Sequence, residues 1–244
     1  MMKVTIIGCC GAYPDANKAT SGYLVETDNT KLLLDCGSGV LSLLQNYISI
    51  EELDAVILSH YHGDHTADVQ SLQYAVEILS RTGNREKILN IFGINQQPYF
   101  NKLSYGEYCK AYQINNNSIV KVGDLSISFS GNVHSMPCLS MKITYKDKSF
   151  VYSGDTEWTD NLIELSRGCE FIICESNLYN NQLGKVPGHL TAGEAGKIAA
   201  QSGVKKLILT HLPHYGNHNQ LINEAKAEFD GIVELASSGK IISI

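Results

Sequence analysis

The segment Ser59–His65 constrains this chain more than any other stretch. Within six positions it places four residues that can bind a metal: His60, His62, Asp64 and His65. The apolar run Leu53–Leu58 before it predicts a buried strand, and residues 66–76 after it predict a helix. The cluster therefore falls on a strand-to-helix loop, where α/β folds place their chemistry. Imidazoles and a carboxylate at such a loop suit zinc or a similar divalent ion.

Other strands also end beside a residue of this kind. Three of them follow an expected strand: His134 after Leu125–Ser130, Asp155 after Ser149–Ser153, and His211 after Leu207–Thr210. His189 precedes a helix expected over Ala192–Ser202, which Thr191 and Glu194 would begin with a capping box. If the strand ends share one edge of packed sheets, all of these side chains converge. A functional site brings such matching ligands, whereas a loop that is merely rich in histidine does not.

Asp35 has two interpretations. The segments Gly22–Thr27 and Lys31–Cys36 predict a hairpin, and Asp35 stands at the end of its second strand, before a glycine-rich turn. The carboxylate could cap a helix that begins near Val40. It could instead orient a metal-bound imidazole from behind. The sequence favours neither interpretation. Farther along, Lys87–Gly93 predicts a strand and Pro98–Tyr112 predicts a helix.

Composition narrows the class of protein. The chain has 244 residues, 43% of them hydrophobic and 18% charged, which is ordinary for a globular protein. The formal net charge of −6 argues against a broad basic surface for long nucleic acids. No apolar run approaches the roughly 20 residues of a membrane span. The N-terminus enters a strand directly, without the layout of a signal peptide.

Cysteine usage predicts a reducing compartment. Seven cysteines are present, an odd number, and no Cys-x-x-Cys pair occurs. A disulfide framework or a cysteine-built zinc site is therefore disfavoured, and a cytoplasmic location fits best. We interpret the cysteines as structural.

Taken in order, these motifs resemble the metallo-β-lactamase superfamily, and the resemblance covers nearly the whole chain. It implies an α/β fold, a four-layer αβ/βα sandwich, as one domain over residues 1–244. It also implies a site for two divalent ions at the sheet edges, zinc by expectation and manganese as the alternative. The motif match assigns His60, His62 and His134 to one ion, Asp64, His65 and His211 to the other, and Asp155 as the bridge.

Details of the motifs indicate a branch of the superfamily. The best-known β-lactamases carry a cysteine where Asp155 stands, so the carboxylate favours other hydrolases. Glyoxalase II is similar at the site but adds a C-terminal helical domain, whereas a short tail follows His211 here. The pair Gly-His189-Leu-Thr and Thr-His211-Leu is similar to the phosphodiesterase branch, which includes RNase Z and small cyclic phosphodiesterases. The resemblance makes His189 catalytic. The expected two-metal mechanism also gives Asp64 a catalytic role, and Thr156, next to Asp155 in the sequence, is expected as a supporting residue behind the ligands.

The absence of a tRNA-binding arm from this sequence indicates the expected substrate. RNase Z carries a long tRNA-binding arm between the positions of His134 and Asp155, where this sequence has room for little more than one hairpin. We therefore expect a binuclear phosphodiesterase for a small cyclic or nucleotide-like phosphodiester. The alternatives are a thioester or lactone hydrolase of the same fold, a tRNA 3′-processing endonuclease, and a metal or ligand sensor that is not an enzyme. The sequence predicts no membrane partner and allows a homodimer.

Overall fold

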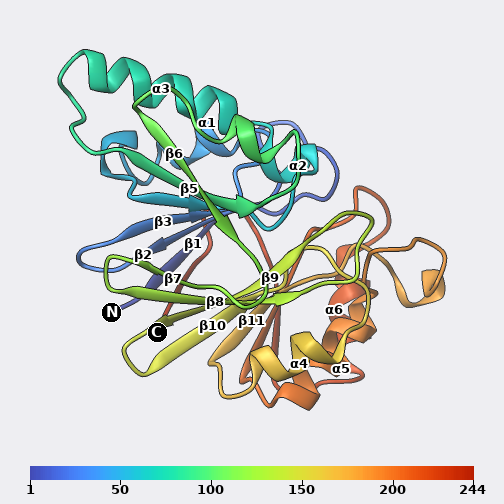
Figure 1. Cartoon of the computed structure of the whole chain (residues 1–244). Helices are drawn as coiled ribbons and strands as arrows, with labels where there is room; N and C mark the ends of the chain where they lie inside the picture. Colours follow the sequence, from blue (N-terminus) through green and yellow to red (C-terminus); the bar gives the residue numbers. More distant parts are fainter. The chain divides into compact units, whose positions relative to one another are not determined.

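The computed structural model describes all residues, 1–244, and they divide into two compact units. Unit 1 consists of Met1–Ile114, Val122–Asp124 and Ser237–Ile244, and unit 2 of Asn115–Lys121 and Leu125–Ala236. The chain forms two seven-stranded sheets, and each unit carries helices against its sheet (Figure 1). Each unit thus supplies one helix layer and one sheet layer. That the whole chain is a single domain stays a prediction.

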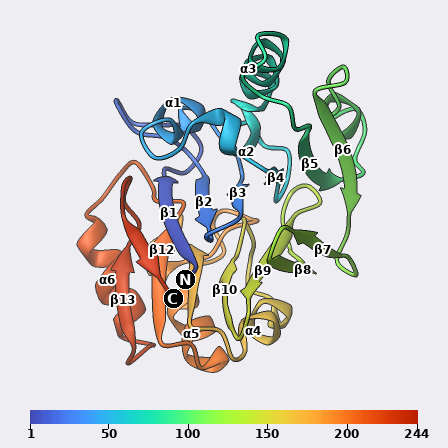
Figure 2. The same ribbon diagram turned by 90° about the vertical axis from the view of Figure 1, so that its left-hand side faces the viewer.

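The sheet of unit 1 has the strand order β14-β1-β2-β3-β4-β5-β6. Its strands are β1 (Lys3–Gly8), β2 (Gly22–Glu26), β3 (Lys31–Leu34), β4 (Ala55–Ile57), β5 (Leu89–Ile94), β6 (Cys109–Ile114) and β14 (Ile241–Ser243). The predicted hairpin is confirmed as β2 and β3, and β3 to β6 then run parallel. Helices α1 (Val40–Leu44), α2 (Gly63–Thr66) and α3 (Val69–Arg81) lie on one face of this sheet (Figure 2).

The helix predicted over residues 66–76 is present, but its start is divided. α2 carries the end of the metal-binding motif, and α3 begins only at Val69. Asp68 separates the two helices, and its carboxylate accepts a hydrogen bond from the backbone N–H of Leu41, at the start of α1. This bond ties the metal-binding segment to the helix that follows β3.

The prediction of a helix over Pro98–Tyr112 is wrong. The structure has only a short 3₁₀ turn, η2 (Phe100–Lys102), followed by strand β6. β6 pairs in parallel with β5 from Leu89 opposite Cys109 to Ile94 opposite Ile114. Its ends are buried while most of its middle is exposed, as an edge strand requires. Pairing with a neighbouring strand therefore overrides the local preference.

The sheet of unit 2 has the strand order β13-β12-β11-β10-β9-β8-β7. Its strands are β7 (Ile119–Val122), β8 (Leu125–Gly131), β9 (Leu139–Tyr145), β10 (Lys148–Tyr152), β11 (Phe171–Glu175), β12 (Lys206–Thr210) and β13 (Ile232–Leu235). Helices α4 (Asp160–Ser166), α5 (Ala192–Ser202) and α6 (His218–Lys226) lie on one face (Figure 2). α5 has the predicted bounds, and Thr191 and Glu194 form the predicted capping box.

Strand direction explains where the site residues lie. β10, β11, β12 and β13 run parallel, and β8 runs in the same direction as β10 because each pairs antiparallel with β9. The residues after these strands therefore reach the same edge of the sheet. In unit 1, the ends of the parallel strands β3 and β4 bring Asp35 and Ser59 to one edge in the same way. No helix of the structure combines the length and apolarity needed to cross a membrane.

Gly37 sets how closely the turn after β3 approaches the metal-binding segment. A Cβ atom at Gly37 would overlap the backbone carbonyl oxygen of Asp64. We expect Gly37→Ala to push this backbone away and to lower the free energy of unfolding by about 1–3 kcal/mol, as overpacking does. Urea unfolding followed by circular dichroism measures it.

Gly63→Ala is the matched control, because a Cβ atom there would meet nothing within 4 Å. Gly63 begins α2, so alanine should leave stability unchanged or raise it by up to about 1 kcal/mol. Equal unfolding midpoints for the two variants would contradict the close approach at Gly37.

Candidate metal centre

In unit 1, a buried carboxylate organises the metal-binding motif. Asp35 is fully buried, and its Oδ1 accepts a hydrogen bond from the Ser59 backbone N–H at 2.7 Å. Its Oδ2 accepts from Ser59 Oγ at 2.8 Å and lies 2.7 Å from His65 Nδ1. The N-cap of α1 is Gly39, so the capping interpretation of Asp35 is excluded. Asp35 instead holds the His65 ring, with Nδ1 as the protonated nitrogen and Nε2 left to bind a ligand.

His60 and His62 bring one ring nitrogen each close together. His60 Nδ1 lies 3.0 Å from Ser59 Oγ, and because that hydroxyl donates to Asp35, it accepts from the imidazole. His60 Nε2 lies 3.0 Å from His62 Nδ1. Two imidazole nitrogens this close, one of them fully buried, have the spacing of two ligands of one metal ion.

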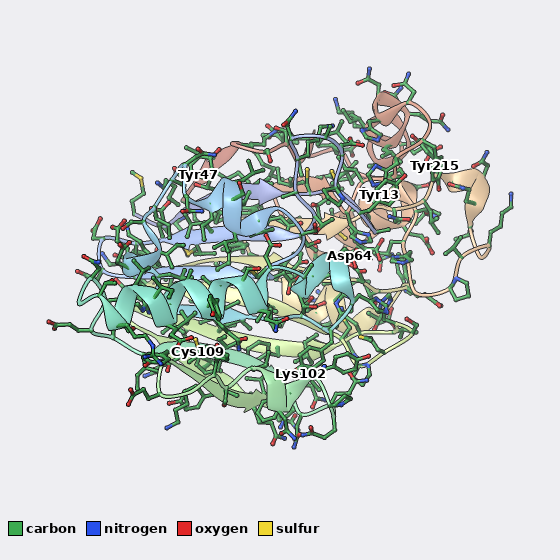
Figure 3. All side chains as sticks on the ribbon, turned by 90° about the horizontal axis from the view of Figure 1, so that it is seen from above. Tyr13, Tyr47, Asp64, Lys102, Cys109 and Tyr215 are labelled. Carbon is green, nitrogen blue, oxygen red and sulfur yellow. The ribbon has the colours of Figure 1, made fainter.

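Asp64 and His65 make a second pair of potential ligands on α2. Asp64 Oδ2 lies 3.6 Å from His65 Nε2, and the backbone N–H of Ala12 donates to the same oxygen at 2.9 Å. The loop after β1 therefore helps to place this carboxylate. Figure 3 shows Asp64 on the short cyan helix α2.

In unit 2, one carboxylate oxygen lies between two imidazoles. Asp155 Oδ2 is 3.9 Å from His134 Nε2 and 3.4 Å from His211 Nε2. All three side chains are nearly inaccessible to solvent. A carboxylate placed between two ligand nitrogens has the position that a bridge between two ions requires.

The backbone of the loop before α5 orients His134. His134 Nδ1 lies 2.8 Å from the carbonyl oxygen of Gly188, which leaves Nε2 toward Asp155. Gly188 has φ +88°, and a Cβ atom there would lie 2.7 Å from His134 Nδ1. Only glycine therefore allows this carbonyl to approach the ring.

A second buried carboxylate, Glu175, holds His189. Glu175 Oε1 lies 3.0 Å from His189 Nδ1 and accepts from the Thr156 backbone N–H at 3.0 Å. Glu175 Oε2 accepts from the backbone N–H groups of Asn177 and Leu190. Glu175, His189 and His211 also have ligand atoms within 4.8 Å of one another. The oxygens of Glu175 already accept these bonds, so we assign Glu175 to orienting His189 rather than to binding metal.

The donor set fits divalent ions of the zinc type. Each unit provides imidazoles and carboxylates whose ligand atoms lie within 4.8 Å: His60 with His62 and Asp64 with His65 in unit 1, and Asp155 with His134 and with His211 in unit 2. Hydrogen bonds to Nδ1 of His60, His65 and His134 leave Nε2 as the ligand atom, as metal-binding histidines require.

The cysteines do not contribute. All seven are free and buried. Burial raises the pKa of the Cys9 thiol to about 12 and that of Cys109 to about 11, and it also raises the pKa of Cys36 and Cys174. A protonated thiol is neither a nucleophile nor a metal ligand.

A comparison with protein families identifies the fold. A family model described as a beta-lactamase superfamily domain matches residues 30–212. The chain belongs to the β-lactamase superfamily. The resemblance drawn from the motifs is confirmed, and so is the predicted metallo-β-lactamase fold, an α/β sandwich.

Relatives span nearly the whole chain. Over 239 residues it is 43% identical to the probable metallo-hydrolase YhfI of Bacillus subtilis, covering 98% of each chain. A crystal structure of YhfI matches with a TM-score of 0.96 over 99% of this chain and 98% of that one. Ribonuclease Z of Methanopyrus kandleri is 27% identical over 98% of this chain and 96% of its own. A diphosphatase of the PhnP family, 13% identical, shares the fold with a TM-score of 0.75 over 100% of this chain and 98% of its own.

Sequence reasoning found the ligand-type residues, but of the residues that orient them it named only Asp35, as one of two interpretations, and Thr156. Thr156 does support the site, because its Oγ1 accepts from the Val133 backbone N–H beside His134. Glu175 and Ser59 had no predicted role. A signal for Glu175 was present, since it ends a strand parallel to the one before Asp155.

Replacing Asp35 tests its role. In Asp35→Asn an amide N–H would face the His65 Nδ1–H, so the ring loses its preferred tautomer. We expect zinc affinity to fall about 10–100-fold, measured by competition with a chromogenic chelator. Asparagine tolerates the left-handed conformation of this position, φ +54°, so the backbone is retained.

Asp54→Asn is the matched control, because Asp54 also accepts a backbone N–H, from Lys31, but lies before β4 rather than after it. It should bind zinc as the wild type does. Zinc affinity of Asp35→Asn within threefold of the wild type would contradict the orienting role.

Proposed function

We propose that this protein is a binuclear metal-dependent phosphodiesterase that hydrolyses a small cyclic or nucleotide-like phosphodiester. The observation that carries the proposal is the position of His189. This residue is held by Glu175 and has its ring 5.3 Å from that of His134 and 5.2 Å from that of His211, measured between centroids. A histidine beside two ligand-type imidazoles, with its own Nδ1 already engaged, is placed to act on substrate rather than on metal.

The ligand assignment is part of the proposal. One ion would be held by His60, His62 and His134, the other by Asp64, His65 and His211, and Asp155 would be shared by both. Both ligand sets stand at the ends of parallel strands, and family membership supports their use in one centre. The donors suit zinc first, with manganese as the alternative. When bound, such ions lower the pKa of a coordinated water and stabilise negative charge on a phosphoryl group.

Two residues carry the remaining chemistry. Asp64 receives a backbone hydrogen bond from Ala12 and lies against His65, so it orients the attacking water as well as binding metal. His189 keeps Nε2 toward the site because Nδ1 faces Glu175. From there it donates to a phosphoryl oxygen or protonates the leaving oxygen.

The segment of unit 2 between His134 and Asp155 indicates the size of the substrate. Only β9 and β10, joined by a tight turn, separate His134 from Asp155, so no arm for a folded RNA stands there. The net charge of −6 also disfavours a polyanion. A relative named ribonuclease Z and a fold neighbour named a diphosphatase both support phosphate-ester chemistry. The buried, free cysteines support a reducing, cytoplasmic location.

A substrate panel tests the proposal. Protein loaded with zinc or with manganese is assayed on bis-p-nitrophenyl phosphate, a 3′,5′-cyclic nucleotide, a thioester, a lactone and a precursor tRNA. We expect kcat/KM to be highest for a small phosphodiester and precursor tRNA to be cleaved poorly at physiological salt. Each alternative has its own result: turnover of the thioester or lactone alone, efficient tRNA cleavage, or full metal loading with no turnover of any ester.

His189→Ala tests the proposed general acid. We expect kcat on the cyclic nucleotide, which has a poor leaving group, to fall about 10²–10⁴-fold while both ions stay bound. The loss on bis-p-nitrophenyl phosphate should be much smaller, because p-nitrophenolate leaves without a proton. Steady-state kinetics and elemental analysis of the same preparation measure both effects.

His218→Ala is the matched control, since His218 also has one ring nitrogen engaged, by the carbonyl oxygen of Pro213, but begins α6 outside the cluster. It should keep wild-type kinetics. Loss of an ion from His189→Ala would make His189 a ligand, and equal losses on the two substrates would exclude the role of general acid.

A further inference from the structure

A cavity in unit 1 opens beside the metal-binding motif. Its volume is about 460 Å³, within the range of small-molecule sites. Tyr61, which stands between His60 and His62 in the chain, lines it, and so does Thr66, whose Oγ1 donates to the carbonyl of His62. The cavity and the ligands thus share one loop. None of the roles proposed above uses it.

Aromatic rings dominate the cavity wall. Tyr61 and Tyr99 stack with their planes 12° apart and their centroids 5.2 Å apart. The phenol of Tyr61 donates to the carbonyl oxygen of Ile94 at 2.7 Å, so its ring is fixed. Tyr99 is 39% exposed and therefore keeps ring surface for a ligand. Tyr105, Val69 and Leu103 add further apolar surface, and polar side chains such as Gln70 and Ser104 line the rest.

The cavity wall also carries a hydrogen-bond acceptor on a buried residue. Gln73 is 3% exposed, and its Nε2 donates to the backbone carbonyls of Lys102 and Leu103, both at 2.9 Å. These two bonds fix the amide, and its Oε1 accepts no hydrogen bond within the protein. A fixed amide oxygen in an aromatic cavity selects a planar ring that carries an N–H donor. Lys102 adds a cation to the lining.

We infer that this cavity is a nucleobase subsite, so that the substrate of the proposed phosphodiesterase is a nucleotide phosphodiester. The base stacks on Tyr99 and donates to Gln73 Oε1, while the phosphate reaches the ligands on the same loop. This inference rests on the proposed function and narrows its substrate class. A nucleobase fits better than a purely apolar group, which would leave Gln73 unpaired.

Gly93 shows that the tyrosine wall depends on close packing. A Cβ atom at Gly93 would lie 2.5 Å from Tyr61 Oη and 2.8 Å from Leu103 Cδ1. Both atoms belong to residues that line the cavity. A side chain at this position, next to the end of β5, would therefore displace the wall.

Two substrates with the same leaving group test the subsite. They are the p-nitrophenyl ester of thymidine 5′-phosphate and methyl p-nitrophenyl phosphate, which has no base. We expect wild-type kcat/KM to be at least tenfold higher for the thymidine ester. In Tyr99→Ala the ratio of the two kcat/KM values should fall at least fivefold, because stacking of one base contributes about 5–150-fold. Tyr99→Phe should keep the ratio.

Tyr47→Ala is the matched control, a tyrosine with the same 39% exposure that does not line the cavity. Its ratio should equal that of the wild type. A wild-type ratio below tenfold, or a fall below fivefold in Tyr99→Ala, would overturn the subsite. Failure of metal-loaded wild type to hydrolyse either ester would instead refute the proposed function.

Ligand binding to the wild-type protein provides a further test. It requires neither turnover nor a variant that folds. Metal-depleted protein is titrated calorimetrically with thymidine 5′-monophosphate and with 2-deoxyribose 5-phosphate. We expect the nucleotide to bind at least fivefold more tightly than the sugar phosphate. Equal affinities, or no binding of either compound, would overturn the subsite.

Discussion

The hydrogen bonds of one buried carboxylate fix the arrangement of the metal-binding segment in unit 1. Asp35 follows β3, and it binds both polar groups of Ser59 and the ring of His65. A carboxylate with no access to water is tolerated only while such partners satisfy it. The end of β3, the loop after β4 and helix α2 are therefore linked, and none of them can move without exposing a costly unpaired charge. The ligand positions follow from that link.

Unit 2 uses the same device with a different residue. Glu175 ends β11 and accepts hydrogen bonds from the backbone of two loops, at Thr156 after β10 and at Leu190 before α5. It also holds His189. In both units a buried carboxylate that we do not assign to a metal fixes the direction of an imidazole. The imidazoles of the cluster are thereby oriented by the protein itself, as a preorganised site requires.

The metal-binding residues and the residues around them differ in what they indicate about the substrate. Histidines and aspartates at strand ends serve many hydrolytic reactions, so the ligands alone do not choose a substrate. We propose that the choice of substrate depends on what surrounds the ligands: a short β9–β10 hairpin in unit 2, and the cavity lined by Tyr61, Tyr99 and Gln73 in unit 1. The sequence already predicts the hairpin, whereas the cavity has no motif and is therefore seen only once the chain is folded.

The sequence by itself determined the superfamily and fold, the hairpin of β2 and β3, helix α5 with its cap, and the residue types of the metal-binding motif. The hairpin, the helix cap and the metal-binding motif each depend on spacing within a short segment, and the superfamily is indicated by the order of such motifs along the chain. The role of Asp35, the strand β6 and the function of Glu175 needed the tertiary structure. Asp35 could equally have capped α1, and β6 is a strand only because β5 lies beside it. A polar side chain at a strand end takes its role from whatever the neighbouring parallel strand brings next to it, and that partner is distant in the sequence.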